Sequence, residues 1–351
     1  MDQVNVLVLA PVRDSDLKAI AAVDPRVVVV DGRGKFEPEY RETWSAEIAR
    51  RYLGAADTQS GKEERDALLR QADVVCIGFP FPTKLVSRAP RLKWIHQTPA
   101  GASNLRYSDV WGSSVLVTTS RGYGNSTAHA EWVLATMLMF IKELPRALMD
   151  KQMGTFEGRP YRPRLLAGKT VGVVGLGGIG REVARLSKAV GMRVVATRRS
   201  ATVRTKGAEG VDELFPPSEL HQLLAASDFV VVCTQSTPET EKLIGRSELT
   251  AMKSTSYLIN LARGEIIDEA ALVEALRQGT IAGAALDVHE SEFQGPPNPE
   301  LIGLPNVIFT PHVSGGSDVP THRGIELFCQ NLGRFLSGQE LLNVVDWQRG
   351  Y

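Results

Sequence analysis

The chain has 351 residues, of which 43% are apolar and 23% charged, a composition typical of a folded protein with two domains of ordinary size. Its 40 basic and 40 acidic residues cancel, so charge gives no reason to expect nucleic acid or an anionic membrane as the main partner. The most membrane-like run, residues 132–141, is too short to span a bilayer, and three cysteines cannot complete a disulfide framework. We therefore expect a reduced, cytoplasmic protein that binds neither nucleic acid nor membrane.

The first 119 residues alternate between short apolar runs and helical segments. The opening run, Val4 to Leu9, has no basic segment before it and no cleavage signal after it, so it is predicted to be a first strand rather than a leader. This alternation predicts an α/β unit. Further strands are expected at 27–30, 74–78, 92–96 and 115–118, helices at 15–22 (with a Ser or Asp cap), 42–53 and 64–71, and polar loops at 32–40 and 57–64.

A long apolar segment follows this first unit. Residues 126–144 are predicted to form one helix, and its apolar side chains are spread around the whole circumference. Such a helix is expected to be buried on more than one side, between domains or between subunits. Residues 145–166 are rich in Arg, Pro and Gly and are predicted to be irregular.

The stretch from Thr170 to Arg185, TVGVVGLGGIGREVAR, contains the pattern G-x-G-x-x-G between a β-branched run and a helical segment. Gly175 is expected to turn the chain tightly, Gly177 to let the backbone approach a pyrophosphate, and Gly180 to let the helix pack on the strand. The start of the helix offers free N–H groups to the phosphate. Because a second strand is expected at 192–197, the stretch reads as a βαβ unit that binds a dinucleotide.

The remaining chain continues the alternation, and three of its strand ends carry polar side chains. Arg263 follows one strand, Asp287 and the acidic residues after it follow the next, and His312 follows the third. Ligands of open parallel sheets bind beyond the carboxyl ends of the strands, so these groups are expected on one rim near the dinucleotide. Strands are predicted at 229–233, 257–261, 283–287 and 307–310, and helices at 220–225, 247–252, 269–278 and 324–337.

Over nearly its whole length the chain resembles the D-isomer-specific 2-hydroxyacid dehydrogenase family. The resemblance rests on GLGGIG, TPETEKLIG (Thr237 to Gly245), NLARGEIIDEAALVEAL, AALDVHESE, TPHVSG and the tail LLNVVDWQRGY. It implies two doubly wound parallel-sheet domains, with a Rossmann dinucleotide-binding domain (residues 120–312) inserted into a flavodoxin-like substrate domain (1–119 and 313–351). It also implies a symmetric homodimer.

Carried over residue by residue, the resemblance makes Arg263, Glu292 and His312 the catalytic set. An arginine offers a planar fork that can hold the carboxylate of a 2-oxo acid and polarise its carbonyl group. A histidine, which changes charge near neutral pH, can exchange a proton with the carbonyl oxygen, and a carboxylate can fix its tautomer. Glu290 is a nearby alternative to Glu292, and His289 a rival partner for the carboxylate. The family usually has Pro directly after this glutamate, where this chain has Phe293.

The resemblance also implies binding residues for a nicotinamide dinucleotide and for the substrate carboxylate. No spacing of His, Cys or Asp residues suggests a metal site. An acidic residue about 20 positions beyond the glycines would favour NAD, but this chain has Arg198 there, which can pair with the 2′-phosphate of NADP. We therefore expect NADP, with NAD as the second choice. The cofactor residues are Gly175, Gly177, Gly178, Ile179, Gly180, Arg198, Arg199, Ser200, Thr234, Thr237, Ala262, Asp287 and Gly315, and the substrate residues are Ala100, Gly101, Ala102 and Arg263.

The leading hypothesis for function is an oxidoreductase that reduces a small 2-oxo acid, such as glyoxylate or hydroxypyruvate, to the D-2-hydroxy acid. An alternative from another class is a non-enzymatic corepressor-like protein that senses the dinucleotide, since a regulator can retain the same residues. A formate dehydrogenase shares the fold, but it pairs its histidine with Gln, and Glu292 argues against that activity.

Overall fold

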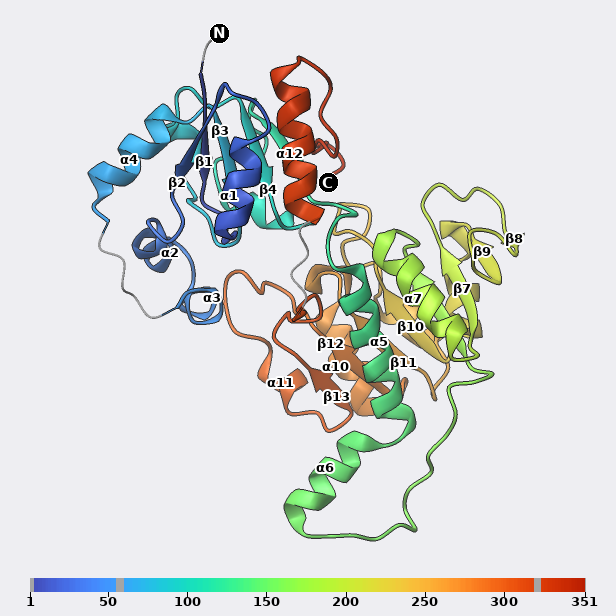
Figure 1. The fold of residues 1–351 in the computed structure, drawn as a ribbon. Helices are drawn as coiled ribbons and strands as arrows, with labels where there is room; N and C mark the ends of the chain where they lie inside the picture. Colours follow the sequence, from blue (N-terminus) through green and yellow to red (C-terminus); the bar gives the residue numbers. More distant parts are fainter. Residues whose placement is uncertain (1–2, 55–59, 319–322, 351) are drawn as a thin grey trace. The chain divides into compact units, whose positions relative to one another are not determined.

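The computed structural model describes residues 3–54, 60–318 and 323–350, and its chain forms two compact units (Figure 1). Unit 1 comprises Met1–Gly124, Phe293–Pro296 and Val319–Tyr351, and unit 2 comprises Asn125–Glu292 and Pro297–Asp318. Unit 2 is thus inserted into the sequence of unit 1. Apart from Phe293–Pro296, the units divide after residues 124 and 318, where the family resemblance implied 119 and 312. Ser120 remains with unit 1 because its backbone N–H donates to the carbonyl groups of Gln97 and Pro99.

Unit 1 contains a five-stranded sheet in the order β2-β1-β3-β4-β5, in which every neighbouring pair is parallel. This is the flavodoxin-like strand order, as the family resemblance implied. The inner strands β3 and β4 are buried along their whole length, which is typical of a parallel sheet, whereas the edge strand β2 is mostly half-buried. The strands are β1 (Val4–Val8), β2 (Val27–Asp31), β3 (Val74–Ile77), β4 (Trp94–Gln97) and β5 (Leu116–Thr119).

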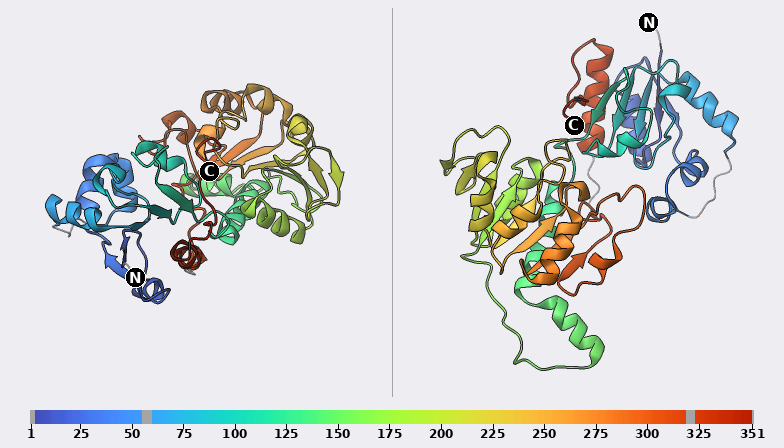
Figure 2. Two further views of the ribbon diagram at one scale, coloured as in Figure 1. Left: turned by 90° about the horizontal axis from the view of Figure 1, so that it is seen from above. Right: turned by 180° about the vertical axis from the view of Figure 1, so that it is seen from behind.

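The helices of unit 1 cover both faces of this sheet (Figure 2). The last of them, α12, comes from the C-terminal part of the chain, and its Phe328 ring lies 5.1 Å from that of Trp94 on β4. Leu332 of α12 is buried in the same cluster, so the end of the chain completes the core of the first unit. The helices are α1 (Asp14–Ala21), α2 (Glu37–Thr43), α3 (Ala46–Tyr52), α4 (Lys62–Gln71) and α12 (Arg323–Leu336), with short 3₁₀ turns at η1 (Val86–Arg88) and η2 (Ser103–Tyr107).

Three local predictions for unit 1 are wrong. The expected helix 42–53 is two helices, because Ser45 is extended and its hydroxyl accepts from the N–H of Ile48 to start α3. The expected loop 32–40 contains the start of α2, whose first turn includes Pro38. The cap of α1 is Arg13 rather than Ser or Asp, and its backbone N–H donates to Asp16. Part of the loop predicted at 57–64 lies outside the described residues.

Unit 2 contains an eight-stranded sheet in the order β13-β12-β11-β10-β6-β7-β9-β8. All neighbours are parallel except the short edge pair β8–β9. If β8 is left out and the strands are numbered along the chain with β6 as strand 1, the order from β9 to β12 is 3-2-1-4-5-6. This is the doubly wound arrangement of dinucleotide-binding domains. The strands are β6 (Thr170–Val174), β7 (Arg193–Thr197), β8 (Thr205–Lys206), β9 (Glu213–Phe215), β10 (Phe229–Val232), β11 (Tyr257–Asn260), β12 (Gly283–Leu286) and β13 (Val307–Phe309).

Alternate residues of these strands enter two separate cores. Val230 and Val232 of β10 pack with one set of helices, whereas Phe229 and Val231 pack with the other. Helices α8, α9 and α10 supply the first core and α5 and α7 the second, so helices cover both faces (Figure 1). The helices are α5 (Ser126–Ile141), α6 (Leu144–Met153), α7 (Gly178–Ala189), α8 (Leu220–Ala226), α9 (Arg246–Ala251), α10 (Glu269–Gln278) and α11 (Pro299–Ile302), with 3₁₀ turns η3 (Pro217–Glu219) and η4 (Gly264–Ile266).

The prediction of one helix over 126–144 followed by an irregular segment is also wrong. Helix α5 ends at Ile141, Glu143 adopts a left-handed conformation (φ 58°), and a second helix, α6, runs through the segment expected to be irregular. Pro145 lies in the first turn of α6, where its missing N–H costs no helical hydrogen bond. The proline therefore marks a helix start.

Among the described helices none is long and apolar enough to cross a membrane. Cys76, Cys233 and Cys329 are free thiols, and burial raises the pKa of Cys233 to about 12 and that of Cys329 to about 11.

Candidate active site

The polar residues expected on one rim of unit 2 follow three neighbouring strands. Arg263 follows β11, Asp287 follows β12 and His312 follows β13, and these strands are adjacent in the order β11-β12-β13. Parallel strands end at the same edge of a sheet, so the chain delivers a guanidinium, a carboxylate and an imidazole to one side of the unit.

His312 and Glu292 form a direct pair. Nδ1 of His312 lies 3.1 Å from one carboxylate oxygen of Glu292 and 3.0 Å from the other. The Glu292 side chain is 1% exposed and that of His312 is 24% exposed, so the carboxylate is buried behind a ring that solvent still reaches. With Nδ1 engaged, Nε2 is the ring nitrogen available to exchange a proton with a ligand.

Asp287 fixes the loop that carries His312. Its Oδ1 accepts from the Thr310 hydroxyl (2.6 Å) and the Val313 N–H (2.8 Å), and its Oδ2 accepts from the Ser314 N–H (2.9 Å). The N–H of His312 donates to the Asp287 carbonyl oxygen at 2.8 Å. These bonds hold His312 in a left-handed backbone conformation, φ 54°, which is uncommon for a residue with a side chain. The predicted contact of Asp287 with the cofactor therefore competes with three donors from its own loop.

Arg263 is held by a close approach of two chain segments. A Cβ atom added to the next residue, Gly264, would lie 1.9 Å from the carbonyl carbon of His289, so only glycine fits there. The side chain of Asn260 donates to the carbonyl oxygen of Arg263 (2.8 Å) and accepts from the N–H of Ala262 (3.0 Å). Nη1 of Arg263 donates to the carbonyl oxygen of Ala262 at 2.6 Å. The backbone that presents the guanidinium is thus rigidly supported.

A second histidine, which the sequence did not assign to the site, lies against the same loop. Nδ1 of His129 on α5 is 2.9 Å from the Ser314 hydroxyl, and a Cβ on Gly315 would lie 2.9 Å from the His129 ring. Burial lowers the pKa of His129 to about 4, so this ring is neutral at pH 7. No local sequence pattern could indicate this contact, because the paired residues are 185 positions apart.

The glycine motif has room for a phosphate at one position. Gly175 has φ +103°, and a Cβ there would lie 2.8 Å from the backbone nitrogen of Thr234. A Cβ on Gly180 would lie 2.3 Å from the carbonyl oxygen of Gly175, whereas one on Gly177 would meet nothing within 4 Å. Glycine is therefore required at 175 and 180, because a side chain there would clash with the backbone, whereas Gly177 leaves open space at the start of α7. This arrangement fits a pyrophosphate at the helix N-terminus.

The other predicted cofactor residues lie in varied settings. Gly178 is the first residue of α7, and Ile179 packs against the core of the unit. Thr234 follows β10 beside the glycine turn, and Ala262 follows β11. The Thr237 hydroxyl lies 3.1 Å from that of Thr240, so it is engaged within its own turn.

The charged residues after β7 form ion pairs. Nη1 of Arg198 lies 2.5 Å from one carboxylate oxygen of Glu209, and Arg181 pairs with the other. Arg199 lies 3.9 Å from Glu239, and Ser200 is exposed. Glu209 lies in the turn between β8 and β9 and belongs to no motif, so the sequence did not point to it.

The predicted substrate loop belongs to unit 1 and follows β4. Gln97 and Asn104 form a reciprocal pair of amide hydrogen bonds (2.9 and 3.2 Å), and the Gln97 amide also donates to the carbonyl oxygen of Gly101. Ala102 is buried, whereas Ala100 and Gly101 are partly exposed. The amide pair thus fixes a loop whose first part remains accessible.

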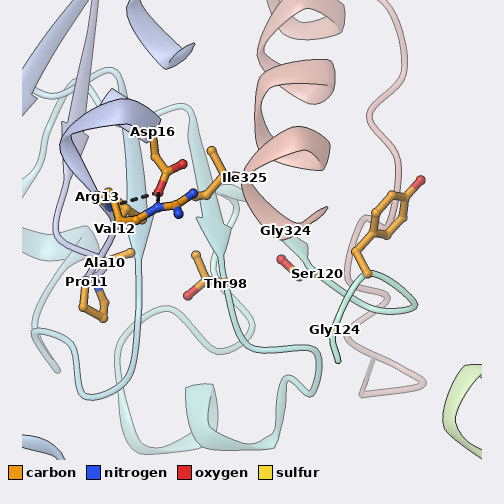
Figure 3. Close-up of a pocket in the computed structure, with 11 residues that line it drawn as sticks. Ala10, Pro11, Val12, Arg13, Asp16, Thr98, Ser120, Gly124, Gly324 and Ile325 are labelled. Carbon is orange, nitrogen blue, oxygen red and sulfur yellow. Dashed lines mark hydrogen bonds and ion pairs between the residues drawn. The ribbon is translucent and has the colours of Figure 1, made fainter. Parts of the chain in front are cut away.

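A pocket of about 240 Å³ lies beside this loop in unit 1 (Figure 3). Arg13 extends across it next to Asp16, and Thr98 and Ser120 also line it. The Ser120 hydroxyl lies 3.2 Å from Nε2 of His96, whose pKa burial lowers to about 3. The pocket lies beyond the carboxyl ends of β1, β4 and β5, where open α/β sheets bind ligands.

Within the described parts of the chain, no group of three or more His, Cys, Asp or Glu side chains is placed to hold a metal ion.

Comparison with known proteins assigns the chain to a family. Residues 134–314 match the model of the D-isomer specific 2-hydroxyacid dehydrogenase NAD-binding domain. A glyoxylate reductase of Thermococcus gammatolerans is 35% identical over 73% of this chain and 77% of its own length. A D-3-phosphoglycerate dehydrogenase of Methanocaldococcus jannaschii is 30% identical over 84% of this chain, but the match spans only 56% of that protein. The chain thus spans about half the length of such D-3-phosphoglycerate dehydrogenases.

Solved structures agree with this assignment over the whole chain. A D-isomer specific 2-hydroxyacid dehydrogenase from Xanthobacter autotrophicus Py2, in complex with NADPH and MES, is 28% identical with a TM-score of 0.74, and the match covers 100% of both chains. An NADPH-dependent glyoxylate/hydroxypyruvate reductase from Sinorhizobium meliloti, in complex with NADP and sulfate, is 25% identical with a TM-score of 0.75 and covers 99% of this chain and 100% of that one. The chain belongs to the D-isomer specific 2-hydroxyacid dehydrogenase family.

Proposed function

We propose that the protein is an NAD(P)-dependent oxidoreductase that reduces a small 2-oxo acid, such as glyoxylate or hydroxypyruvate, to the D-2-hydroxy acid. The observation that carries the proposal is the pair of buried Glu292 and accessible His312, on the same edge of the sheet as Arg263. The glycine turn of the same unit has open space for a pyrophosphate at Gly177. The named relatives, a glyoxylate reductase and a glyoxylate/hydroxypyruvate reductase, support this substrate class.

The proposed roles follow from the chemistry of each side chain. A bound nicotinamide would supply the hydride to the carbonyl carbon. Arg263 holds the substrate carboxylate with its planar fork and polarises the carbonyl group. Nε2 of His312 gives a proton to the carbonyl oxygen as negative charge develops there, and takes it back in the reverse reaction. Glu292 fixes the tautomer of His312 through Nδ1 and stabilises the charged ring.

A panel of 2-oxo acids assayed with NADPH and NADH tests this function directly. Turnover is expected with acids whose side chains are small, glyoxylate and hydroxypyruvate among them. Tight dinucleotide binding without turnover of any acid would instead favour the corepressor-like alternative.

We propose that NADPH is the preferred cofactor, and we expect its kcat/KM to exceed that of NADH by at least about tenfold. Charge-assisted hydrogen bonds from Arg198 to the 2′-phosphate, worth roughly 1.5–3 kcal/mol, give this preference. The bound NADPH and NADP of the two related structures support it. Arg198→Asp is expected to shift the preference toward NADH, because it removes a partner of the phosphate and adds repulsion. Steady-state kinetics with both cofactors measures the shift.

The matched control is Arg246→Asp, which makes the same charge change at an exposed pair with Glu274. It should leave the ratio of the two kcat/KM values unaltered. Equal efficiency with NADPH and NADH in the unmodified protein would refute the preference.

We propose that the protein is a homodimer that associates through α6 and the segment after it. Helix α5, which the sequence predicted to lie between domains or subunits, directs Val133 and Met137 into the core of its own unit. The exposed apolar side chains lie instead on α6 and beyond, where Leu148 is 56% and Phe156 86% exposed around a shallow apolar hollow. Such a patch is typical of an interaction surface, and a two-fold dimer would bury it in both copies.

Light scattering is therefore expected to report twice the monomer mass at micromolar concentration. Leu148→Glu should shift the protein toward monomer, because it places charge in the patch. Val203→Glu, at a 64% exposed apolar residue elsewhere in unit 2, should leave the mass unchanged. A monomeric unmodified protein would exclude the dimer.

We also propose a location in the reducing cytoplasm. The proposal is supported by the three free thiols, none of which is paired in a disulfide.

A further inference from the structure

Glu209 joins two arginines that come from different segments of unit 2. Its carboxylate pairs with Arg198, directly after β7, and with Arg181, in the first half of α7 next to the glycine motif. The side chains of the three residues are 28% to 46% exposed, so the cluster is open to a ligand from solvent. Two positive charges therefore share one negative charge at the end of the βαβ unit where the adenine ribose of a dinucleotide is expected.

The arrangement of Glu209 is held by these pairs. Its φ is 52°, a left-handed conformation that is uncommon for a residue with a side chain, in the turn between β8 and β9. Partial burial raises the pKa of its carboxyl group, but the hydrogen bonds from Arg198 and Arg181 outweigh this and hold the pKa below its usual value. The carboxylate is thus ionised at neutral pH.

We infer that Glu209 is a selectivity residue that limits the preference for NADP over NAD. The inference rests on the proposed function, in which Arg198 binds the 2′-phosphate. Arg198 uses Nη1 for Glu209, so a phosphate has to share or displace this partner. A 2′-phosphate carries a charge of about −1.5 to −2 at neutral pH, and the nearby carboxylate repels it.

The same carboxylate suits the ribose of NAD. A 2′-hydroxyl group donates a hydrogen bond, and an ionised glutamate accepts one. Sites selective for NAD obtain this acceptor from an acidic residue at the end of the second strand, where this chain has Arg198. Glu209 supplies the acceptor from the turn before β9 instead. Arg198, which can bind a 2′-phosphate, and Glu209, which can accept from a 2′-hydroxyl group, therefore lie beside each other.

The test compares two probes of the adenine ribose on the full-length protein by titration calorimetry. Adenosine 2′,5′-bisphosphate carries the 2′-phosphate, and 5′-AMP carries the free 2′-hydroxyl. In Glu209→Gln the ratio of the Kd of 5′-AMP to that of the bisphosphate is expected to rise about tenfold, because the repulsion of the 2′-phosphate is lost. A ratio that is unchanged or falls would overturn the inference.

Glu274→Gln is the matched control, since it removes one negative charge from a similar exposed pair with Arg246. It should leave the ratio unchanged. Glu209→Ala separates repulsion from positioning: it should also raise the ratio, and a fall would mean that Glu209 only orients the arginines, which contradicts the inference.

The unmodified protein distinguishes this inference from the proposed cofactor preference. If it binds 5′-AMP more tightly than the bisphosphate, the preference for NADP fails, while a raised ratio in Glu209→Gln still supports the role of Glu209. If it prefers the bisphosphate and Glu209→Gln changes nothing, the role of Glu209 alone fails.

Discussion

Replacing His312 by alanine is expected to lower kcat by about 10²- to 10⁴-fold while the Kd of NADPH stays within about twofold of the unmodified protein. This is the usual contribution of a positioned general acid. Nδ1 of His312 is engaged by the buried Glu292, so the ring is oriented and Nε2 is the only ring nitrogen left to reach a substrate. Since His312 lies in a loop fixed by Asp287, the substitution is expected to leave the backbone in place. Stopped-flow reduction of glyoxylate and a fluorescence titration with NADPH measure the two quantities.

Two further variants make this result specific. Glu292→Gln keeps the shape of the side chain but removes its charge, so it should lower kcat less than His312→Ala does. His221→Ala removes an exposed histidine of α8 that pairs only with Glu248 among the contacts described, and should leave kcat unaltered. A near-normal kcat in His312→Ala would exclude this residue as the proton donor.

The two sheets could be predicted from the sequence because their strands carry a strong local signal. Most are apolar runs bounded by polar or turn residues, such as Phe229 to Val232, and helical segments separate successive runs. The short strands β8 and β9 carry no such run and were not predicted. A chain that alternates in this way has few arrangements open to it, since crossovers between parallel strands are right-handed. The alternation of strands and helices therefore predicted α/β units, whereas the flavodoxin-like and Rossmann arrangements were implied by the family resemblance.

The predicted helix boundaries were wrong where contacts between neighbouring residues decide the structure. The hydroxyl of Ser45 starts a new helix inside a segment whose composition favours one continuous helix. Glu143 enters a left-handed conformation that ends α5, and Pro145 then starts α6. The segment was predicted to be irregular because of its content of Arg, Pro and Gly, although a proline in a first turn is compatible with a helix.

The positions of the site residues and the pair of His312 and Glu292 were predictable, but several other partners were not. Motif spacing singles out Arg198, yet its partner Glu209 comes from a turn that has no periodic pattern. Likewise Ser314 contacts His129 across 185 positions of the chain. A sequence motif specifies which residue type stands at a strand end, whereas its hydrogen bonds depend on which other segments the fold brings beside it. The roles assigned to these residues stay predictions that kinetics can test.

Arg263→Lys is expected to lower kcat/KM for a 2-oxo acid by about 10²-fold, with kcat falling as well. A lysine keeps the positive charge but offers a point charge in place of a planar fork, so it cannot donate two parallel hydrogen bonds to a carboxylate. Each charge-assisted bond is worth roughly 1.5–3 kcal/mol, and loss of one accounts for about 10- to 100-fold.

The backbone around Arg263 makes this loss hard to recover. The Asn260 side chain bonds the backbone of Ala262 and Arg263, and Gly264 lies against the backbone of His289, so the segment cannot shift to bring a shorter group closer. Saturation kinetics with glyoxylate separates the two possible roles. If only KM rises while kcat stays intact, Arg263 anchors the carboxylate without polarising the carbonyl group. Arg246→Lys, at an exposed pair on α9, is the control for the exchange itself and should change neither constant.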